Sequence, residues 1–233
     1  MQFSKWHALG NTYIVVEPGG AGRLEAERVR ELSRDVDGVL EVLSTDGDTV
    51  EIVIWNADGS QAELSGNGTR IAAAWLAERT GATSIRVRVG PREVLTRIFE
   101  SGDIEQDLGD VDVGESEQID GIDLVPVLVG NPHAVVQGDP ADVVRLGPLL
   151  ETHERFPQRT NVQVARVVCP GEVTARVWER GVGETASSGT GAVAVAAATH
   201  HDGDVLVHFP GGDLRVRLQD GRAYLTGRAE RLS

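Results

Sequence analysis

Cysteine and lysine each occur once in this chain of 233 residues, as Cys169 and Lys5. A single cysteine excludes a disulfide within the chain and a site built from several thiolates. Lys5 falls in a predicted strand, whereas pyridoxal-phosphate enzymes need an active-site lysine for their Schiff base. The sequence therefore predicts neither a disulfide framework nor pyridoxal-phosphate chemistry.

Positive charge is also scarce, because 36 acidic side chains outnumber 22 lysines and arginines and give a net charge of −14. Nucleic acids and anionic membranes bind to basic faces, which this composition disfavours. No apolar run approaches the length of a membrane span, and the first residues are too polar for a secretory signal. We expect a cytoplasmic protein with a small-molecule partner and leave a homodimer open.

The chain does contain an internal repeat. Ser65-Gly66-Asn67-Gly68 runs into an apolar, alanine-rich segment, and Ser188-Gly189-Thr190-Gly191 does the same in the second half. Trp55 and Trp178 precede the two segments by the same number of residues. Since strands are predicted before each segment and a helix after it, the repeat predicts a mixed α/β (α+β) fold with two pseudo-symmetric domains.

The most acidic stretch, Gly102 to Asp123, separates the two copies of the repeat. Low hydrophobicity and like charge disfavour a packed element, so we place the domain boundary there, with domains at residues 1–116 and 117–233. We expect that the final strand packs on the first domain. An exposed edge strand over Ile104 to Val113 is the alternative interpretation of the acidic stretch.

Each repeated segment opens a predicted helix. The first N–H groups of a helix have no internal partner and carry partial positive charge, so they bind anions such as carboxylates. Two such helix starts facing each other would hold one small anionic ligand, with Ser65 and Ser188 on its opposite sides. The alternative is that each serine is only an N-cap.

Further polar side chains lie where predicted strands end. An arginine fork suits a carboxylate, and a glutamate suits an ammonium group or a histidine. The alternatives are a structural histidine, an exposed ion pair of little energetic weight and asparagines that merely favour turns. The candidates are His133, Glu179, Arg180, Asn11, Asn56, Asn131 and Asn161.

His200, His201, Asp202 and Asp204 form the one histidine-rich group that invites a metal interpretation. Adjacent histidines after a helix point in different directions, and the usual ligand spacings are absent. We therefore predict no metal site and no cofactor.

As an ordered set, several motifs resemble the diaminopimelate epimerase family. The resemblance implies two similar α/β domains, each with mixed β-structure wrapped around a central helix. It also implies cofactor-free inversion of an amino-acid α-carbon, as in the conversion of LL- to meso-2,6-diaminopimelate in lysine and peptidoglycan precursor biosynthesis. The motifs are Phe3 to Asn11, Asn56 to Ser60, Ser65 to Arg70, Gly130 to His133, Arg159 to Asn161, Glu179 to Thr185 and Ser188 to Gly191.

In that family two cysteines face the α-carbon, one as thiolate base and one as thiol acid, and here Ser65 and Ser188 occupy their positions. The resemblance implies that His133 and Glu179 assist the proton transfers. It implies that backbone amides at Gly66, Asn67, Gly189 and Thr190 hold the reacting carboxylate. It assigns the distal amino-carboxylate to Asn11, Asn56, Asn131, Asn161, Glu179 and Arg180.

The chain departs from the family pattern at the two serines, at Thr12 and at Arg34 to Gly38. A thiol has a pKa of about 8.5, which a helix N-terminus lowers further, whereas an alcohol is a far weaker acid. We therefore expect little or no thiol-type epimerase activity. Three interpretations remain open: serines introduced to trap a bound amino acid, a natural branch with lyase or other isomerase chemistry using a hydroxyl and His133, and a non-catalytic amino-acid-binding protein.

Overall fold

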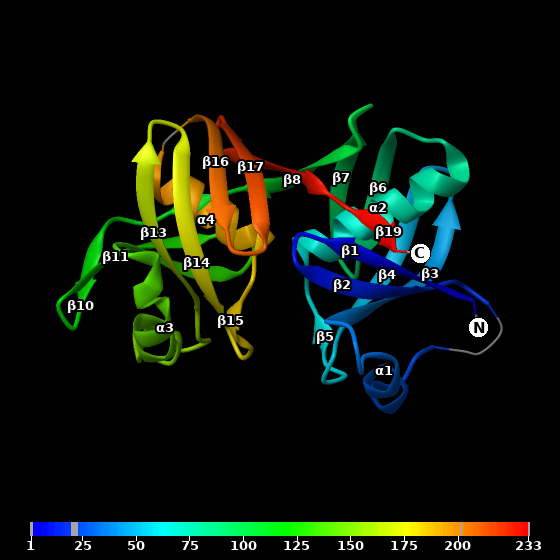
Figure 1. Cartoon of the computed structure of the whole chain (residues 1–233), viewed down its shortest axis with the longest axis horizontal. Coiled ribbons are helices and arrows are strands. Elements are labelled where there is room, and N and C mark those ends of the chain that lie inside the picture. Colours follow the sequence, from blue (N-terminus) through cyan, green and yellow to red (C-terminus); the bar gives the residue numbers. More distant parts are fainter. Residues whose placement is uncertain (1, 20–22, 201, 233) are drawn as a thin grey trace. The chain divides into compact units, whose positions relative to one another are not determined.

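The computed structural model describes residues 2–19, 23–200 and 202–232. The chain packs as two compact units (Figure 1), one of Met1–Gln106 with Gly227–Ser233 and the other of Asp107–Thr226. Packing and duplication need not divide a chain at the same residue, so the predicted boundary of the duplicated halves, at residues 116 and 117, stays a prediction.

The first unit alternates antiparallel and parallel strand pairings. Its strands are β1 (Phe3–Ala8), β2 (Asn11–Val16), β3 (Gly38–Asp46), β4 (Thr49–Asn56), β5 (Gln61–Ala62), β6 (Ser84–Val89) and β7 (Arg92–Ile98). The hairpins β1–β2, β3–β4 and β6–β7 are antiparallel, and β2–β3 and β4–β6 are parallel. The alternation of apolar residues in Val39 to Leu43 and Thr49 to Trp55 predicts the hairpin between β3 and β4, which is confirmed.

The second unit repeats this plan. Its strands are β11 (Ile122–Leu128), β12 (Pro132–Gln137), β13 (Asn161–Cys169), β14 (Glu172–Glu179), β15 (Gly183–Thr185), β16 (Gly203–Phe209) and β17 (Gly212–Gln219). The pairs β11–β12, β13–β14 and β16–β17 are antiparallel, while β12–β13 and β14–β16 are parallel. The predicted internal duplication and mixed α/β class are confirmed.

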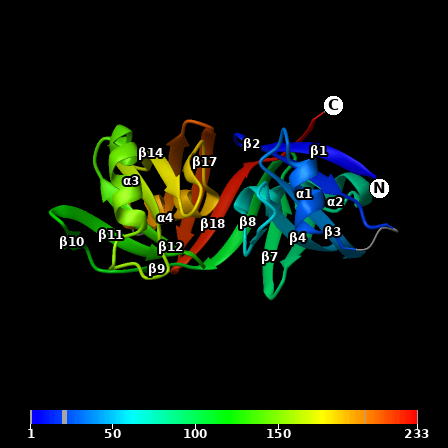
Figure 2. The ribbon, with the colours of Figure 1, turned by 90° about the horizontal axis from the view of Figure 1, so that it is seen from below.

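Each unit encloses one helix, α2 (Gly66–Thr80) in the first and α4 (Gly189–Thr199) in the second (Figures 1 and 2). Ala72 and Ala73 of α2 and Ala194 and Ala196 of α4 are buried completely. Small side chains let strands approach these helices from several sides, which explains why both helices are rich in alanine. The sequence predicts that the first helix ends at Gly81, and this is confirmed: Gly81 is the C-cap and adopts the left-handed conformation.

The remaining helices are α1 (Ala26–Leu32), the short 3₁₀ helix η1 (Pro140–Asp142) and α3 (Val143–Glu151). The sequence Gly147-Pro148 predicts an interruption of the helix expected within Pro140 to Leu150, and this is wrong, because α3 runs through Pro148. Burial of Leu146 and Leu150 offsets the hydrogen bond that proline removes. Among the described residues, no helix is long and apolar enough to cross a membrane.

The acidic stretch was expected to lack a packed element, and this is wrong; of the alternative, an exposed edge strand over Ile104 to Val113, the strand is confirmed but not the exposure. It forms β8 (Asp103–Asp110), β9 (Asp112–Val113) and β10 (Glu117–Ile119), and β8 pairs with β18 (Arg222–Arg228), which β19 (Glu230–Leu232) follows. Ile104 and Gln106 of β8 are buried. Arg222 bonds Asp107 at 3.0 Å and Asp110 at 2.9 Å, so basic partners offset part of the like-charge repulsion.

Candidate functional site

The two serines of the repeat occupy equivalent helix starts. Ser65 Oγ accepts a hydrogen bond from the Gly68 amide at 3.1 Å, and Ser188 Oγ accepts one from the Gly191 amide at 3.3 Å. Both serines are therefore N-caps, as the structural interpretation predicts. The helices begin at Gly66 and Gly189, and amides at these first positions have no carbonyl partner inside the helix. The two helix starts thus keep anion-binding character.

In the first unit, polar side chains gather around the start of α2. Asn67 donates to Asn11 Oδ1 at 2.6 Å and accepts from the guanidinium of Arg70. Arg70 also donates to Gln106 Oε1 at 2.9 Å. Asn56 bonds within its own loop instead, donating to Ser60 Oγ at 2.9 Å. The structure therefore joins Asn11 to the helix start directly and leaves Asn56 in a separate turn.

Arg70 is the member of this group whose role the sequence analysis missed. Its side chain is buried completely, and its Nε has no hydrogen-bond partner among the described residues. Burial lowers the pKa of Arg70 to about 10, because the charged guanidinium loses solvation. The start of α2 thus has a buried cation close beneath it.

In the second unit, His133 is held on both ring nitrogens. Nε2 lies 2.9 Å from Asn131 Oδ1, and Nδ1 lies 3.0 Å from Gln163 Nε2. Asn131 in turn lies 3.5 Å from Thr190 Oγ1 on α4. The pKa of His133 is lowered to about 4, chiefly by burial and in part by the positive charge of Arg180. His133 is therefore neutral near pH 7 and links Asn131 to the sheet.

Glu179 lies at the end of β14 beside the start of α4. Thr185 Oγ1 donates to its Oε1 at 2.5 Å, and a second hydrogen bond joins Glu179 to the side chain of Ser188. Loss of solvation raises the pKa of Glu179, while these two hydrogen bonds oppose the rise. A carboxyl group with a raised pKa in contact with a serine hydroxyl is suited to proton exchange with that hydroxyl.

Asn161 and Arg180 are joined in the same unit. Asn161 Oδ1 accepts from the Arg180 backbone amide at 3.0 Å, and its Nδ2 donates to the Pro132 carbonyl at 2.9 Å. The Arg180 guanidinium donates to the Gln158 carbonyl at 3.2 Å. These bonds fix the backbone at the positions predicted to hold a ligand's distal end.

Glu151, at the end of α3, supports this segment and was also missed. Its carboxylate accepts from Trp178 Nε1 at 2.7 Å and from the Gly181 amide at 2.8 Å. Arg159 approaches the same carboxylate at 3.4 Å. A buried glutamate on a helix gives no sequence signal that tells which loop it holds.

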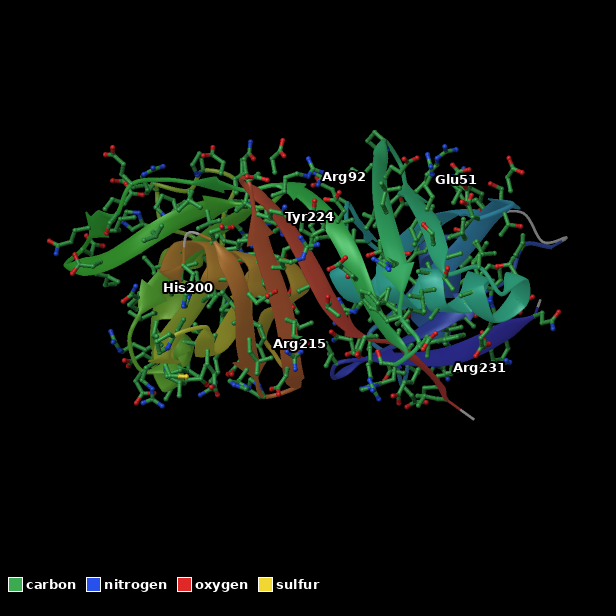
Figure 3. The ribbon with its side chains drawn as sticks, turned by 90° about the horizontal axis from the view of Figure 1, so that it is seen from above. Glu51, Arg92, His200, Arg215, Tyr224 and Arg231 are labelled. Carbon is green, nitrogen blue, oxygen red and sulfur yellow. The ribbon has the colours of Figure 1, made fainter. Side chains whose placement is uncertain are left out.

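In the histidine-rich group, the ring nitrogens of His200 are occupied by hydrogen bonds within the protein. His200, which follows α4 (Figure 3), accepts from the Gly171 amide at 3.2 Å and contacts Thr199 Oγ1 at 2.8 Å. His201 lies outside the described residues. Across the ranges that the structure describes, no group of three metal-ligating side chains is suitably arranged.

The structure thus groups the predicted residues within each unit. The first group contains Ser65, Gly66, Asn67 and Asn11. The second contains Ser188, Gly189, Thr190, Asn131, His133, Asn161, Glu179 and Arg180. That both groups act on one ligand stays a prediction.

Comparison with known proteins is consistent across the whole chain. The family model for diaminopimelate epimerase matches residues 3–114 and 125–232. The diaminopimelate epimerase of Methanothermobacter thermautotrophicus is 35% identical over 97% of this chain and 95% of its own. That of Synechococcus elongatus is 34% identical over 98% of this chain and 95% of its own.

Solved structures share the fold at lower identity. A predicted epimerase from Pseudomonas aeruginosa superposes with a TM-score of 0.78 at 18% identity, covering 99% of this chain and 96% of the other. A hydroxyproline epimerase from Agrobacterium vitis, with bound trans-4-hydroxy-L-proline, superposes with a TM-score of 0.69 at 15% identity. The match covers 99% of this chain and 89% of the other. On the family-model match and the curated relatives, the chain belongs to the diaminopimelate epimerase family.

Proposed function

We propose that this chain is an epimerase that inverts the α-carbon of a diaminopimelate-like amino acid, converting the LL to the meso form without a cofactor. Names of relatives at about a third identity support the reaction class, and the chain spans almost their full length. The single observation that carries the proposal is the pair of equivalent helix starts, each fronted by a serine hydroxyl.

Inversion of one carbon needs a proton-transferring group on each face of the substrate, and we assign these roles to Ser65 and Ser188. The amides of Gly66 and Asn67 and of Gly189 and Thr190 bind the reacting carboxylate, which stabilises the negative charge that develops beside it. Asn11, Asn56, Asn131, Asn161, Glu179 and Arg180 bind the distal amino-carboxylate.

On the face of the substrate assigned to Ser188, Glu179 is placed to exchange a proton with the serine hydroxyl. Glu179 bonds to Ser188, and its raised pKa allows it to hold a proton at a higher pH than an ordinary carboxyl group does. His133 is neutral and bonded on both nitrogens, so we assign it to the orientation of Asn131 rather than to proton transfer. Because alcohols are weak acids, turnover is expected below that of a thiol-based enzyme.

A non-catalytic amino-acid-binding protein is the second candidate. The observation that favours it is that both serine hydroxyls already cap their helices, at 3.1 and 3.3 Å from the amides of Gly68 and Gly191. A capping serine needs no chemistry to explain it.

The test combines calorimetry with solvent deuterium exchange at the α-carbon of LL-diaminopimelate, followed by NMR. Binding with exchange and appearance of the meso isomer supports the epimerase. Binding with no exchange at any pH favours the binding protein. No binding of the LL or meso isomer removes diaminopimelate as the ligand.

A further inference from the structure

Tyr13 on β2 contacts the serine of the first helix start. Its phenol oxygen lies 3.4 Å from Ser65 Oγ, and either oxygen is able to donate. Ser65 Oγ already accepts from the Gly68 amide, which leaves the serine's own proton available for the phenol oxygen. Contacts of this length in a free enzyme commonly shorten when the substrate binds.

The tyrosine ring is held in place by its neighbours. Tyr13 is 9% exposed and lies opposite Gly38 in the parallel β2–β3 pairing. A Cβ on Gly38 would lie 2.7 Å from Tyr13 Cε1 and 2.4 Å from the Trp55 carbonyl oxygen. Only glycine leaves room for the ring there, so the phenol keeps a fixed position beside Ser65.

Arg70 supplies the charge that makes this phenol chemically useful. The guanidinium is buried completely, and two of its acceptors, Asn67 Oδ1 and Gln106 Oε1, are neutral amides. It also interacts electrostatically with Tyr13, an attraction that opposes the loss of its charge on burial. By reciprocity, the same attraction favours the phenolate over the neutral phenol and opposes the effect of the tyrosine's own burial.

We propose that Tyr13 acts through Ser65 as the proton acceptor on the first face, replacing a thiolate with a phenolate–hydroxyl relay. This inference rests on the proposed function. In the forward step the α-carbon–hydrogen bond breaks and its electron pair stays on the α-carbon. That proton bonds to Ser65 Oγ while the serine's own proton bonds to the phenolate oxygen of Tyr13. Tyr13 becomes neutral, and the negative charge passes to the substrate.

The relay predicts an increase in proton abstraction with rising pH, because it needs the phenolate. Other ionisable groups lie on the elements that pack against β2, among them Lys5 on β1, Glu41 and Asp46 on β3, and Glu78 and Arg79 on α2. His7 on β1 accepts from the Gly10 amide, and Asp37, before β3, accepts from the Thr12 amide at 2.7 Å. Arg70 lies on α2. Variants of Tyr13 itself must therefore decide which group causes the rise in α-proton exchange at alkaline pH, here called the alkaline limb.

The first experiment compares Tyr13→Phe with Tyr224→Phe, which alters the other of the two tyrosines. Tyr224 lies on β18 (Figure 3), with the Arg217 guanidinium 3.8 Å above its ring. We expect Tyr13→Phe to bind diaminopimelate as the wild type does, but to lose about 10²-fold in α-proton exchange together with the alkaline limb. Tyr224→Phe should keep both.

Equal exchange rates and pH profiles for wild type and Tyr13→Phe would overturn the relay while leaving the proposed epimerase standing. Binding without exchange in the wild type would overturn it as well. Loss of binding in Tyr13→Phe would show that the hydroxyl serves ligand binding instead, which also contradicts the relay.

A second measurement needs no substrate and decides the case if the wild type binds no diaminopimelate. In the Tyr224→Phe protein, Tyr13 is the sole tyrosine, so ultraviolet absorbance of tyrosinate reports its ionisation alone. Replacing Arg70 by Met should move that ionisation to higher pH, and Arg70→Lys should restore it. Ionisation that does not respond to the charge at residue 70 would refute the inference.

Discussion

Gln163 places its amide nitrogen 3.0 Å from Nδ1 of His133. An amide nitrogen only donates, so Nδ1 accepts and the single ring proton sits on Nε2, where it is donated to Asn131 Oδ1 at 2.9 Å. This arrangement satisfies both contacts with a neutral ring, and protonation would bring two donors together at Nδ1. His133 is therefore locked in one tautomer, and Asn131 is oriented by it.

The first prediction is that this histidine makes stability fall in mild acid. Burial lowers the pKa of His133 to about 4 from its usual 6.5, so between these values the unfolded chain binds more protons than the folded one. The free energy of unfolding should decrease as pH falls from 6.5 toward 4, by roughly 3 kcal/mol in total from this group.

Urea denaturation across that pH range measures the effect. His133→Asn should flatten this part of the profile, whereas His7→Gln, at a partly exposed histidine, should retain the wild-type slope. An unchanged slope in His133→Asn would mean that another group carries the acid sensitivity.

The second prediction concerns His208, whose pKa is raised in the folded protein, whereas that of His133 is lowered. His208 lies between two carboxylates, with Nδ1 2.7 Å from Asp213 and Nε2 2.8 Å from Glu172. The hydrogen bond to Asp213 chiefly raises the pKa of His208, although burial opposes the rise. The stabilisation is complete below the usual pKa of about 6.5 and is lost as pH rises through the higher folded value.

NMR titration of the imidazole and urea denaturation above pH 6 test this. His208→Gln should remove the alkaline decrease in stability while Asp213→Asn weakens it. A titration midpoint of His208 at or below the unperturbed value would contradict the bridging arrangement.

Most of the fold could be predicted from the sequence, because the repeat carries it. Trp55 and Trp178 precede Ser65 and Ser188 by the same number of residues, and that spacing, together with the repeated glycine-bearing segments, indicates equivalent strand–loop–helix units. The predictions were wrong where tertiary contacts outweigh the local preferences of single residues. Pro148 suggested a break in a helix that core packing sustains, and acidity obscured β8, whose carboxylates meet Arg222.

The candidate site was predictable only in part. Motif residues such as His133 and Glu179 could be named from the sequence, but their ionisation could not, because it depends on burial and on partners distant in the chain. Tyr13 reads as an ordinary apolar position of a strand, and only the structure brings its hydroxyl to Ser65. Long-range contacts of that kind leave no periodicity in a sequence.

The third prediction tests Glu151 as a support for the Arg180 segment. Glu151→Gln keeps the side chain's shape but replaces one acceptor with an N–H₂ group, so the indole of Trp178 or the Gly181 amide loses its partner. We expect a loss of roughly 1–3 kcal/mol in the free energy of unfolding. Affinity for diaminopimelate should weaken too, because Asn161 bonds the same backbone.

The matched control is Glu154→Gln, which removes an exposed carboxylate from the adjoining loop. It should change neither stability nor affinity appreciably. If Glu151→Gln lost stability but bound the ligand normally, Glu151 would be a purely structural residue.

The fourth prediction returns thiols to the two helix starts. A helix N-terminus lowers a cysteine's pKa, so Ser65→Cys combined with Ser188→Cys should supply a thiolate base and a thiol acid. We expect α-proton exchange to increase by about 10²-fold or more over the wild type. The price in stability is roughly 1 kcal/mol for each weakened N-cap.

The double variant is best made with Cys169→Ala, because Cys169 is exposed and is the one native cysteine. Thiol alkylation then reports on the introduced residues alone, and protection by diaminopimelate places each of them at the ligand. The single variants should exchange more slowly than the double variant, since inversion needs a competent group on both faces. A folded double variant that binds diaminopimelate yet exchanges no faster than the serine protein would show that helix-start thiols are insufficient here, and that the rest of this site no longer supports thiol-based proton transfer.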